Sequence, residues 1–86
     1  MVDLKIKKLV LDVLKPRLPS LPEFASFLAE FKGLTRVDVS LVEMDSKTDS
    51  LTVVLVGSGF AYNDLKEHIE KQGAVIHSVD QIVVEK

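Results

Sequence analysis

An 86-residue chain with 47% hydrophobic and 28% charged residues has the size of one small domain and a globular rather than a disordered composition. Its formal net charge of −2 gives no strong field to attract nucleic acid or an acidic membrane surface. The chain has no cysteine, which excludes disulfides, thiolate metal sites and cysteine nucleophiles. No signal peptide is evident in Met1 to Lys5, so we expect a cytoplasmic protein. A domain this small has a thin core, which association with further copies would enlarge.

The apolar run from Leu9 to Leu14 predicts a central β-strand that begins near Lys5. The run is too short to span a membrane, which takes about 20 apolar residues. Successive side chains of a strand point to opposite faces, so an acid, Asp12, lies on one face among apolar neighbours. Pro16 ends the strand because proline has no N–H for the hydrogen-bond ladder.

A helix follows the proline-rich connection. Ser20 and Glu23 have the spacing of a capping box, with Pro22 in the first turn. An apolar stripe at helical spacing then follows and ends before Gly33, the expected stop; its members are Phe24, Phe27, Leu28 and Phe31.

The remaining pattern predicts strands at 36–44 and 51–56, a helix from Tyr62 or Asn63 to Gln72, and a strand at 75–84. The polar residues 45–50 indicate a hairpin turn, and Gly57-Ser58-Gly59 is expected to break the third strand. The order βαββαβ with right-handed crossovers predicts one α+β domain over residues 1–86, a ferredoxin-like plait. In this plait a four-stranded antiparallel sheet carries both helices on one face, and the first and third strands are central.

Two helices cover only one sheet face. Strand parity assigns to that face Leu9, Leu11, Val13, Val37, Val39, Leu41, Leu51, Val53 and Leu55. The opposite face then carries Val10, Asp12, Leu14, Ser40, Val42, Thr52, Val54 and Val56, without a helix to bury its apolar members. Such a surface is typical of an interface, so we expect a homo-oligomer. A solvated face and a ligand groove are the alternatives.

Asp12, His77 and Asp80 are the candidate site. A carboxylate among apolar residues of a central strand is costly unless it is paired or binds a metal. The fourth strand lies beside the first, and by parity its His77 shares a face with Val75 and Val79, whereas Asp80 points the other way unless a bulge intervenes. Together they would suit a hard cation such as calcium or magnesium, or a pH-sensitive contact, but not tight zinc or copper. The alternative is a structural Asp12 at an oligomer interface, bonded to a lysine, a histidine or backbone N–H.

Three further groups have simpler interpretations. Asp64 and His68, four residues apart on the second helix, are expected to form a surface ion pair rather than half of a metal site. Gly57-Ser58-Gly59 is read as a strand-to-helix turn rather than an anion cradle. The acids around the hairpin, Glu43, Asp45 and Asp49, are read as solvated charge rather than a loose cation site.

The pattern gives no support for catalysis or nucleic-acid binding. No serine, histidine and acid set has a recognisable local signature. The two central strands, as predicted, have no aromatic residue for base stacking, so we expect no nucleic-acid partner and no membrane partner.

The segments Leu11-Asp12-Val13-Leu14-Lys15-Pro16 and Ile76-His77-Ser78-Val79-Asp80, with Met44-Asp45 and Gly73, resemble a family of small archaeal proteins of unassigned function. The resemblance covers nearly the whole chain and implies a ferredoxin-like fold and ring-like homo-oligomers. It implies no established activity, so it carries over no catalytic residues and no cofactor. It does place the three candidate site residues in its two most specific segments.

The sequence therefore predicts a non-enzymatic, self-associating module, with a divalent cation or small ligand at subunit contacts as an open hypothesis. The alternative is a small-molecule enzyme or an amino-acid-sensing regulatory domain. Regulatory plaits often have a glycine after the first strand, and the segment from Pro16 to Pro19 has none.

Overall fold

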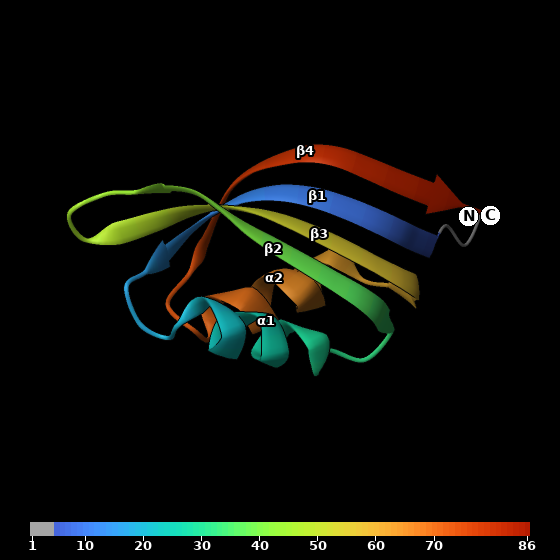
Figure 1. Ribbon diagram of the computed structural model, residues 1–86. Coiled ribbons are helices and arrows are strands. Elements are labelled where there is room, and N and C mark those ends of the chain that lie inside the picture. The colour runs from blue at the N-terminus through green and yellow to red at the C-terminus, as the bar shows by residue number, and fades with distance from the viewer. Residues whose placement is uncertain (1–4) are drawn as a thin grey trace.

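A computed structural model describes residues 5–86 as a four-stranded antiparallel sheet with two helices on one face (Figure 1). Its elements are β1 (Lys5–Pro16), α1 (Leu21–Ala29), β2 (Leu34–Met44), β3 (Thr48–Phe60), α2 (Tyr62–Glu70) and β4 (Val75–Glu85). The strand order is β2-β3-β1-β4, so β1 and β3 are central and β2 and β4 are edges. The ferredoxin-like plait predicted from the sequence is confirmed.

The β2–β3 hairpin projects beyond the helical layer, at the end of the sheet opposite the C-terminal end of β4 (Figure 1). This projection contributes to an elongated molecule, 45 Å along its longest axis and 18 Å along its shortest. Leu41, which we expected in the core, is 47% exposed because it lies on edge strand β2 toward the projecting end.

The helices begin as predicted but end earlier. Ser20 caps α1: its Oγ accepts from the Glu23 N–H at 3.4 Å, and its own N–H donates to Glu23 Oε1 at 3.1 Å. Hydrogen bonds to the Glu23 carboxyl from the side chain and backbone N–H of Ser20 lower its pKa below its ordinary value of 4.5. Gly33 and Gly73 have positive φ angles of 102° and 77°, and each lies in the turn after its helix rather than at the last helical residue.

The prediction that Gly57-Ser58-Gly59 breaks the third strand is wrong, because β3 continues to Phe60. The glycines are needed for close approach, since the loop after α1 lies against this part of β3. The Ser58 N–H donates to the Gly33 carbonyl at 3.0 Å, and a Cβ on Gly57 would lie 2.2 Å from the same oxygen. The central strand β3 therefore does have an aromatic residue, but Phe60 packs against the core, edge-to-face with Phe31.

The core lies between the helices and the sheet. Its buried residues come from β1, β3, both helices and the residue just before β4: Leu9, Leu11, Val13, Phe24, Leu28, Leu51, Val53, Leu55, Leu65, Ile69 and Ala74. The period-two assignment of β1 and β3 to a helix-covered face is thus confirmed, because every second residue is buried from Leu9 to Lys15 and from Asp49 to Leu55.

We call the other side of the sheet the open face. Cross-strand pairing arranges its side chains in four rows, each of which crosses all four strands. The rows are given in order from the Lys5 end of β1 toward the hairpin. In the order β2, β3, β1, β4 they are Arg36, Val56, Lys8 and Val83; Asp38, Val54, Val10 and Gln81; Ser40, Thr52, Asp12 and Ser78; and Glu43, Ser50, Leu14 and Val75. The open face is therefore more polar than the sequence indicated, and Val42 lies in a bulge instead of a row.

Candidate functional site

Asp12 lies at the centre of the open face and is half-buried. Its neighbours across the strands are Thr52 on β3 and Ser78 on β4, and Ser40 on β2 completes an entirely polar row. The expectation that Asp12 lies among apolar residues holds along β1 but is wrong across the sheet. The sequence alone concealed this because the neighbours of a central strand come from distant parts of the chain.

Two bulges in β4 change the parity on which the site prediction rested. The pairing with β1 passes from Ile76 to Ser78 and from Val79 to Gln81, so His77 and Asp80 are the extra residues. The Ser78 hydroxyl donates to Asp80 Oδ1 at 2.6 Å. Asp80 is therefore hydrogen-bonded to the residue that faces Asp12. The sequence analysis allowed for this arrangement only if β4 contained a bulge.

The same bulges separate two valines that parity had placed together. Val75 lies opposite Leu14 on the open face, whereas Val79 lies opposite Leu11 on the helix-covered face. The prediction that they share a face is wrong, because each inserted residue shifts the alternation by one position. His77 itself is exposed in its bulge.

In the part of the chain that the structure describes, no three His, Cys, Asp or Glu side chains group closely enough to hold a metal ion. Asp12 and Asp80 lie near one another through Ser78, with His77 on the adjacent bulge. The metal hypothesis for Asp12, His77 and Asp80 thus remains a prediction, and within one copy it has an incomplete ligand set. A second copy or water would have to supply the remaining ligands.

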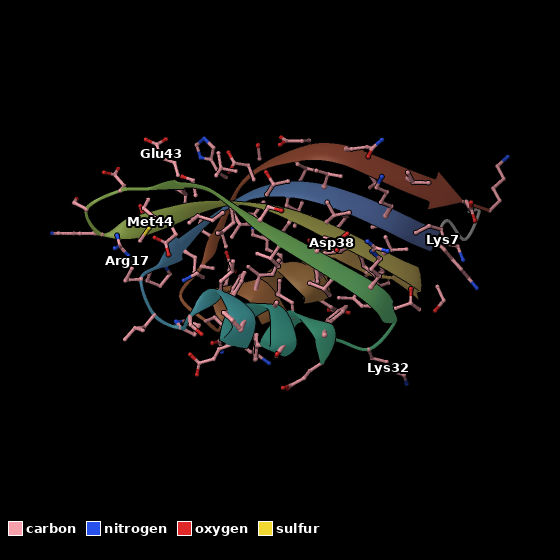
Figure 2. The ribbon with its side chains drawn as sticks, viewed as in Figure 1. Lys7, Arg17, Lys32, Asp38, Glu43 and Met44 are labelled. Atoms are coloured by element: carbon pink, nitrogen blue, oxygen red, sulfur yellow. The ribbon has the colours of Figure 1, made fainter. Side chains whose placement is uncertain are left out.

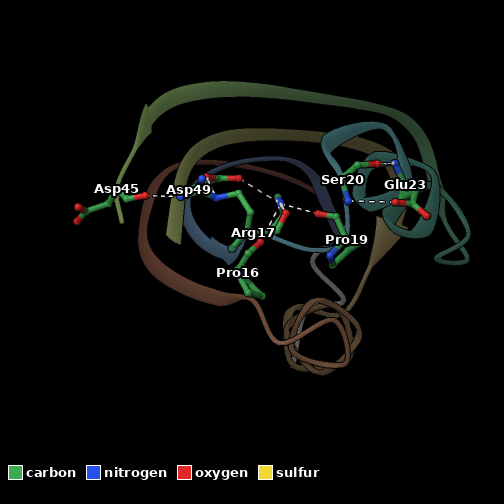
Figure 3. A network of polar contacts seen from close by, with 8 residues as sticks. Pro16, Arg17, Pro19, Ser20, Glu23, Asp45 and Asp49 are labelled. Carbon is green, nitrogen blue, oxygen red and sulfur yellow. Dashed lines mark hydrogen bonds and ion pairs between the residues drawn. The ribbon is translucent and has the colours of Figure 1, made fainter. Parts of the chain in front are cut away.

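The strongest polar network lies under the hairpin and was missed by the sequence analysis (Figure 3). Lys15 is only 1% exposed, and its Nζ lies 3.3 Å from Asp49 Oδ2. The same ammonium donates to the carbonyls of Pro16, Arg17 and Pro19 at 2.9, 3.3 and 2.6 Å. These contacts anchor the loop that leads to the capping box of α1.

Arg17 closes the network on its exposed side. Its Nε lies 3.2 Å from Asp49 Oδ1, and its guanidinium donates to the backbone carbonyl of Asp45. A signal for this network was present in the sequence, because Lys15 continues the alternation of buried residues Leu11 and Val13. A lysine at a core position requires an acid opposite it, and the β1–β3 register supplies Asp49.

The three acids near the hairpin are therefore not one cluster. Asp49 is buried against Lys15 and Arg17, whereas Glu43 lies on the open face opposite Ser50. Asp45 accepts a hydrogen bond at Oδ1 from the Ser46 N–H at 2.8 Å. The interpretation of all three as solvated charge is wrong for Asp49.

Among the residues that the structure describes, His68 does not form the surface ion pair with Asp64 that we expected. Its ring stacks on Phe27 with centroids 4.2 Å apart and an interplanar angle of 3°. Its Nε2 lies 2.8 Å from the Phe27 carbonyl oxygen. His68 thus joins the two helices rather than forming half of a metal site.

Two surface hollows lie away from Asp12. One of about 290 Å³ lies between α1 and edge strand β2, beside Ala25, Ala29 and Arg36. The other, about 560 Å³, lies beside Gly59 and is lined by the charged residues Lys32 and Asp64.

The family model described as uncharacterized ArCR, DUF211, matches residues 7–86 and so spans β1 to β4. The chain belongs to the DUF211 family. A relative from Methanocaldococcus jannaschii, named uncharacterized protein MJ0319, is 32% identical over 81 residues, which cover 94% of this chain and 84% of the relative. The resemblance to a small archaeal family of unassigned function is confirmed. Neither name gives an activity that assigns a role to Asp12, His77 or Asp80.

Neither helix in the described part of the chain is long and apolar enough to cross a membrane.

Proposed function

We propose that this chain is a non-enzymatic module that functions by self-association, with the open face of its sheet covered by a further copy. One observation carries this proposal: both helices lie on the same side of the sheet, so the other side has no cover within the described chain (Figure 1). Val10, Leu14, Val54 and Val56 are only half-buried there. Covering them would add apolar burial to a core of eleven residues.

Sedimentation equilibrium at micromolar concentration tests this proposal. We expect a mass that is a multiple of the 9.5 kDa chain. Val54→Glu should lower the association constant at least tenfold because it places a charge beside Val10 and Val56, among the apolar residues of the two central strands on the open face. Leu18→Glu is the matched control, since Leu18 is 76% exposed in the loop after β1 and does not belong to a row. A strict monomer, or equal effects of both variants, would reject the proposal.

A divalent cation at the contact between copies is a second candidate. It is supported by the β4 bulges, which link Asp80 to the residue facing Asp12. A hard cation takes carboxylate oxygens, and copies that meet across the open face would bring two such pairs near one contact.

Titration calorimetry with calcium, magnesium, manganese and zinc tests the cation. We expect calcium or magnesium to give heat with the wild type but not with Asp12→Ala, whereas Asp64→Ala should behave as the wild type. Flat traces for the wild type with all four metals would reject a cation while leaving self-association standing.

A further inference from the structure

The charges of the open face are distributed unevenly along the strands. The row farthest from the hairpin carries Arg36 and Lys8, and each of the other three rows carries one acid: Asp38, Asp12 or Glu43. Figure 2 shows Glu43 toward the hairpin and Lys7, the neighbour of Lys8, at the opposite end. The open face is thus basic at one end and acidic toward the other, which suits contact with a reversed copy of itself.

Arg36 is available for such a contact. Within the chain it pairs with Asp38, with Nε 3.0 Å from Oδ2, but the two side chains are 69% and 46% exposed. An ion pair this exposed contributes little to stability, because water screens both charges. If the Arg36 side chain turns toward an acid of another copy, the folded chain therefore loses little stability.

The sheet edges are less suited to pairing between copies than the open face. β2 carries extra residues at Thr35 and Val42, and β4 carries them at His77 and Asp80. Bulges interrupt the row of backbone hydrogen-bonding groups and protect edge strands from adding a neighbour. A further copy is better accommodated on the face.

The open face is large enough for a stable contact. Four strands about 4.8 Å apart span about 19 Å, and the 12 residues of β1 extend about 40 Å at about 3.3 Å each. The product is about 760 Å² per copy, or about 1,500 Å² for two copies, which falls in the range of stable protein interfaces.

We infer that two copies meet open face to open face about a two-fold axis perpendicular to the strands, an arrangement that rests on the proposed self-association. This contact closes at two copies, so the ring-like assembly that the family resemblance implies requires a second contact elsewhere on the chain. This axis reverses the order of the rows and keeps the order of the strands. Arg36 of each copy then faces Glu43 of the other. Lys8 faces Leu14 of the other copy, and Asp12 of that copy lies two residues along the strand, about 7 Å away and within reach of a lysine side chain.

This arrangement gives Asp12 a cationic partner that the single chain does not provide on its row. A two-fold axis parallel to the strands would instead place the basic ends of both copies together and would repel. The charge pattern therefore selects one of the two face-to-face arrangements.

Mixing two charge variants tests the arrangement. Arg36→Glu alone places two acids opposite one another at each contact, and Glu43→Arg alone places two bases opposite one another. Each variant should therefore associate at least tenfold more weakly than the wild type. In an equimolar mixture both contacts become complementary, and association should return to near the wild-type constant. The double variant R36E/E43R should also associate. Within one copy, positions 36 and 43 are about 20 Å apart along β2, so rescue cannot arise inside a chain.

Lys66→Glu and Glu67→Arg on α2 are matched controls, because both residues are exposed and α2 lies on the opposite side of the sheet. Neither control should weaken association, and mixing them should change nothing. Circular dichroism confirms that each variant is folded. If the wild type associates but the charge variants do not weaken it, or do not rescue one another, the arrangement is wrong and self-association stands. A monomeric wild type rejects both.

Discussion

Replacing Lys15 tests whether the buried network under the hairpin holds the fold together. Lys15→Met keeps an unbranched apolar stem, one atom shorter than lysine, and removes an ammonium that contacts Asp49 and three backbone carbonyls. Removing one partner of a buried ion pair costs about 3–5 kcal/mol, because the other charge stays buried. Arg17 remains 3.2 Å from Asp49 and partly compensates, so we expect about 3 kcal/mol.

That loss is large for this chain. At about 0.05–0.15 kcal/mol per residue, 86 residues give a total free energy of unfolding of about 4–13 kcal/mol. A loss of about 3 kcal/mol would lower the melting temperature by about 12–24 °C for a domain of this size. Urea denaturation followed by circular dichroism measures the free energy, and calorimetry measures the melting temperature.

Two companion variants separate the causes. Lys47→Met is the matched control, because Lys47 is exposed at the hairpin turn, and it should change stability by less than about 0.5 kcal/mol. The double variant K15M/D49L removes both buried charges and should recover part of the loss, with the remainder reporting the lost carbonyl contacts of Lys15 and the lost Arg17–Asp49 pair. A loss below about 1 kcal/mol for Lys15→Met would refute the reasoning, since it would mean that water already solvates the ammonium.

Substitutions at four further positions test other parts of the fold. Ser20→Ala should cost about 1 kcal/mol in urea denaturation by removing the N-cap of α1. The lowered pKa of Glu23 means that the folded state favours its carboxylate. The contribution of this carboxylate, separate from that of the Ser20 hydroxyl, is present above pH 4.5 and is lost as the pH falls through the folded pKa. The melting temperatures of wild type and Glu23→Gln should therefore converge on acidification; a constant difference would contradict this. Gly57→Ala should destabilise by about 1–3 kcal/mol, because its Cβ would lie 2.2 Å from a backbone oxygen; an unchanged urea midpoint would contradict the close approach. His68→Phe keeps a ring against Phe27 but loses the hydrogen bond, so it should cost about 1 kcal/mol, and an equal loss for His68→Ala would show that stacking contributes nothing.

Most of the architecture was predictable because local signals and the hydrophobic period agree. The alternation around Leu11 predicted the faces of β1, and the capping box at Ser20 predicted the start of α1; the structure has both. The errors occur where distant segments meet. Gly57 looks like a breaker in sequence, yet it provides space for the Gly33 loop, and the neighbours of Asp12 are set by bulges that no period reveals. Lys15 was missed because its role depends on Asp49, a partner in a distant part of the chain.

The segment from Leu11 to Pro16, one of the two that the family resemblance rests on, has two kinds of positions with separate duties. Leu11, Val13 and Lys15 point inward and maintain the interior, whereas Asp12 and Leu14 point outward and meet whatever approaches the sheet. A member of the family that keeps Lys15 but has another residue in place of Asp12 would share this fold and differ in what binds its open face. Sequence identity counted over the whole segment would not show that difference, whereas identity counted separately over the inward and outward positions would.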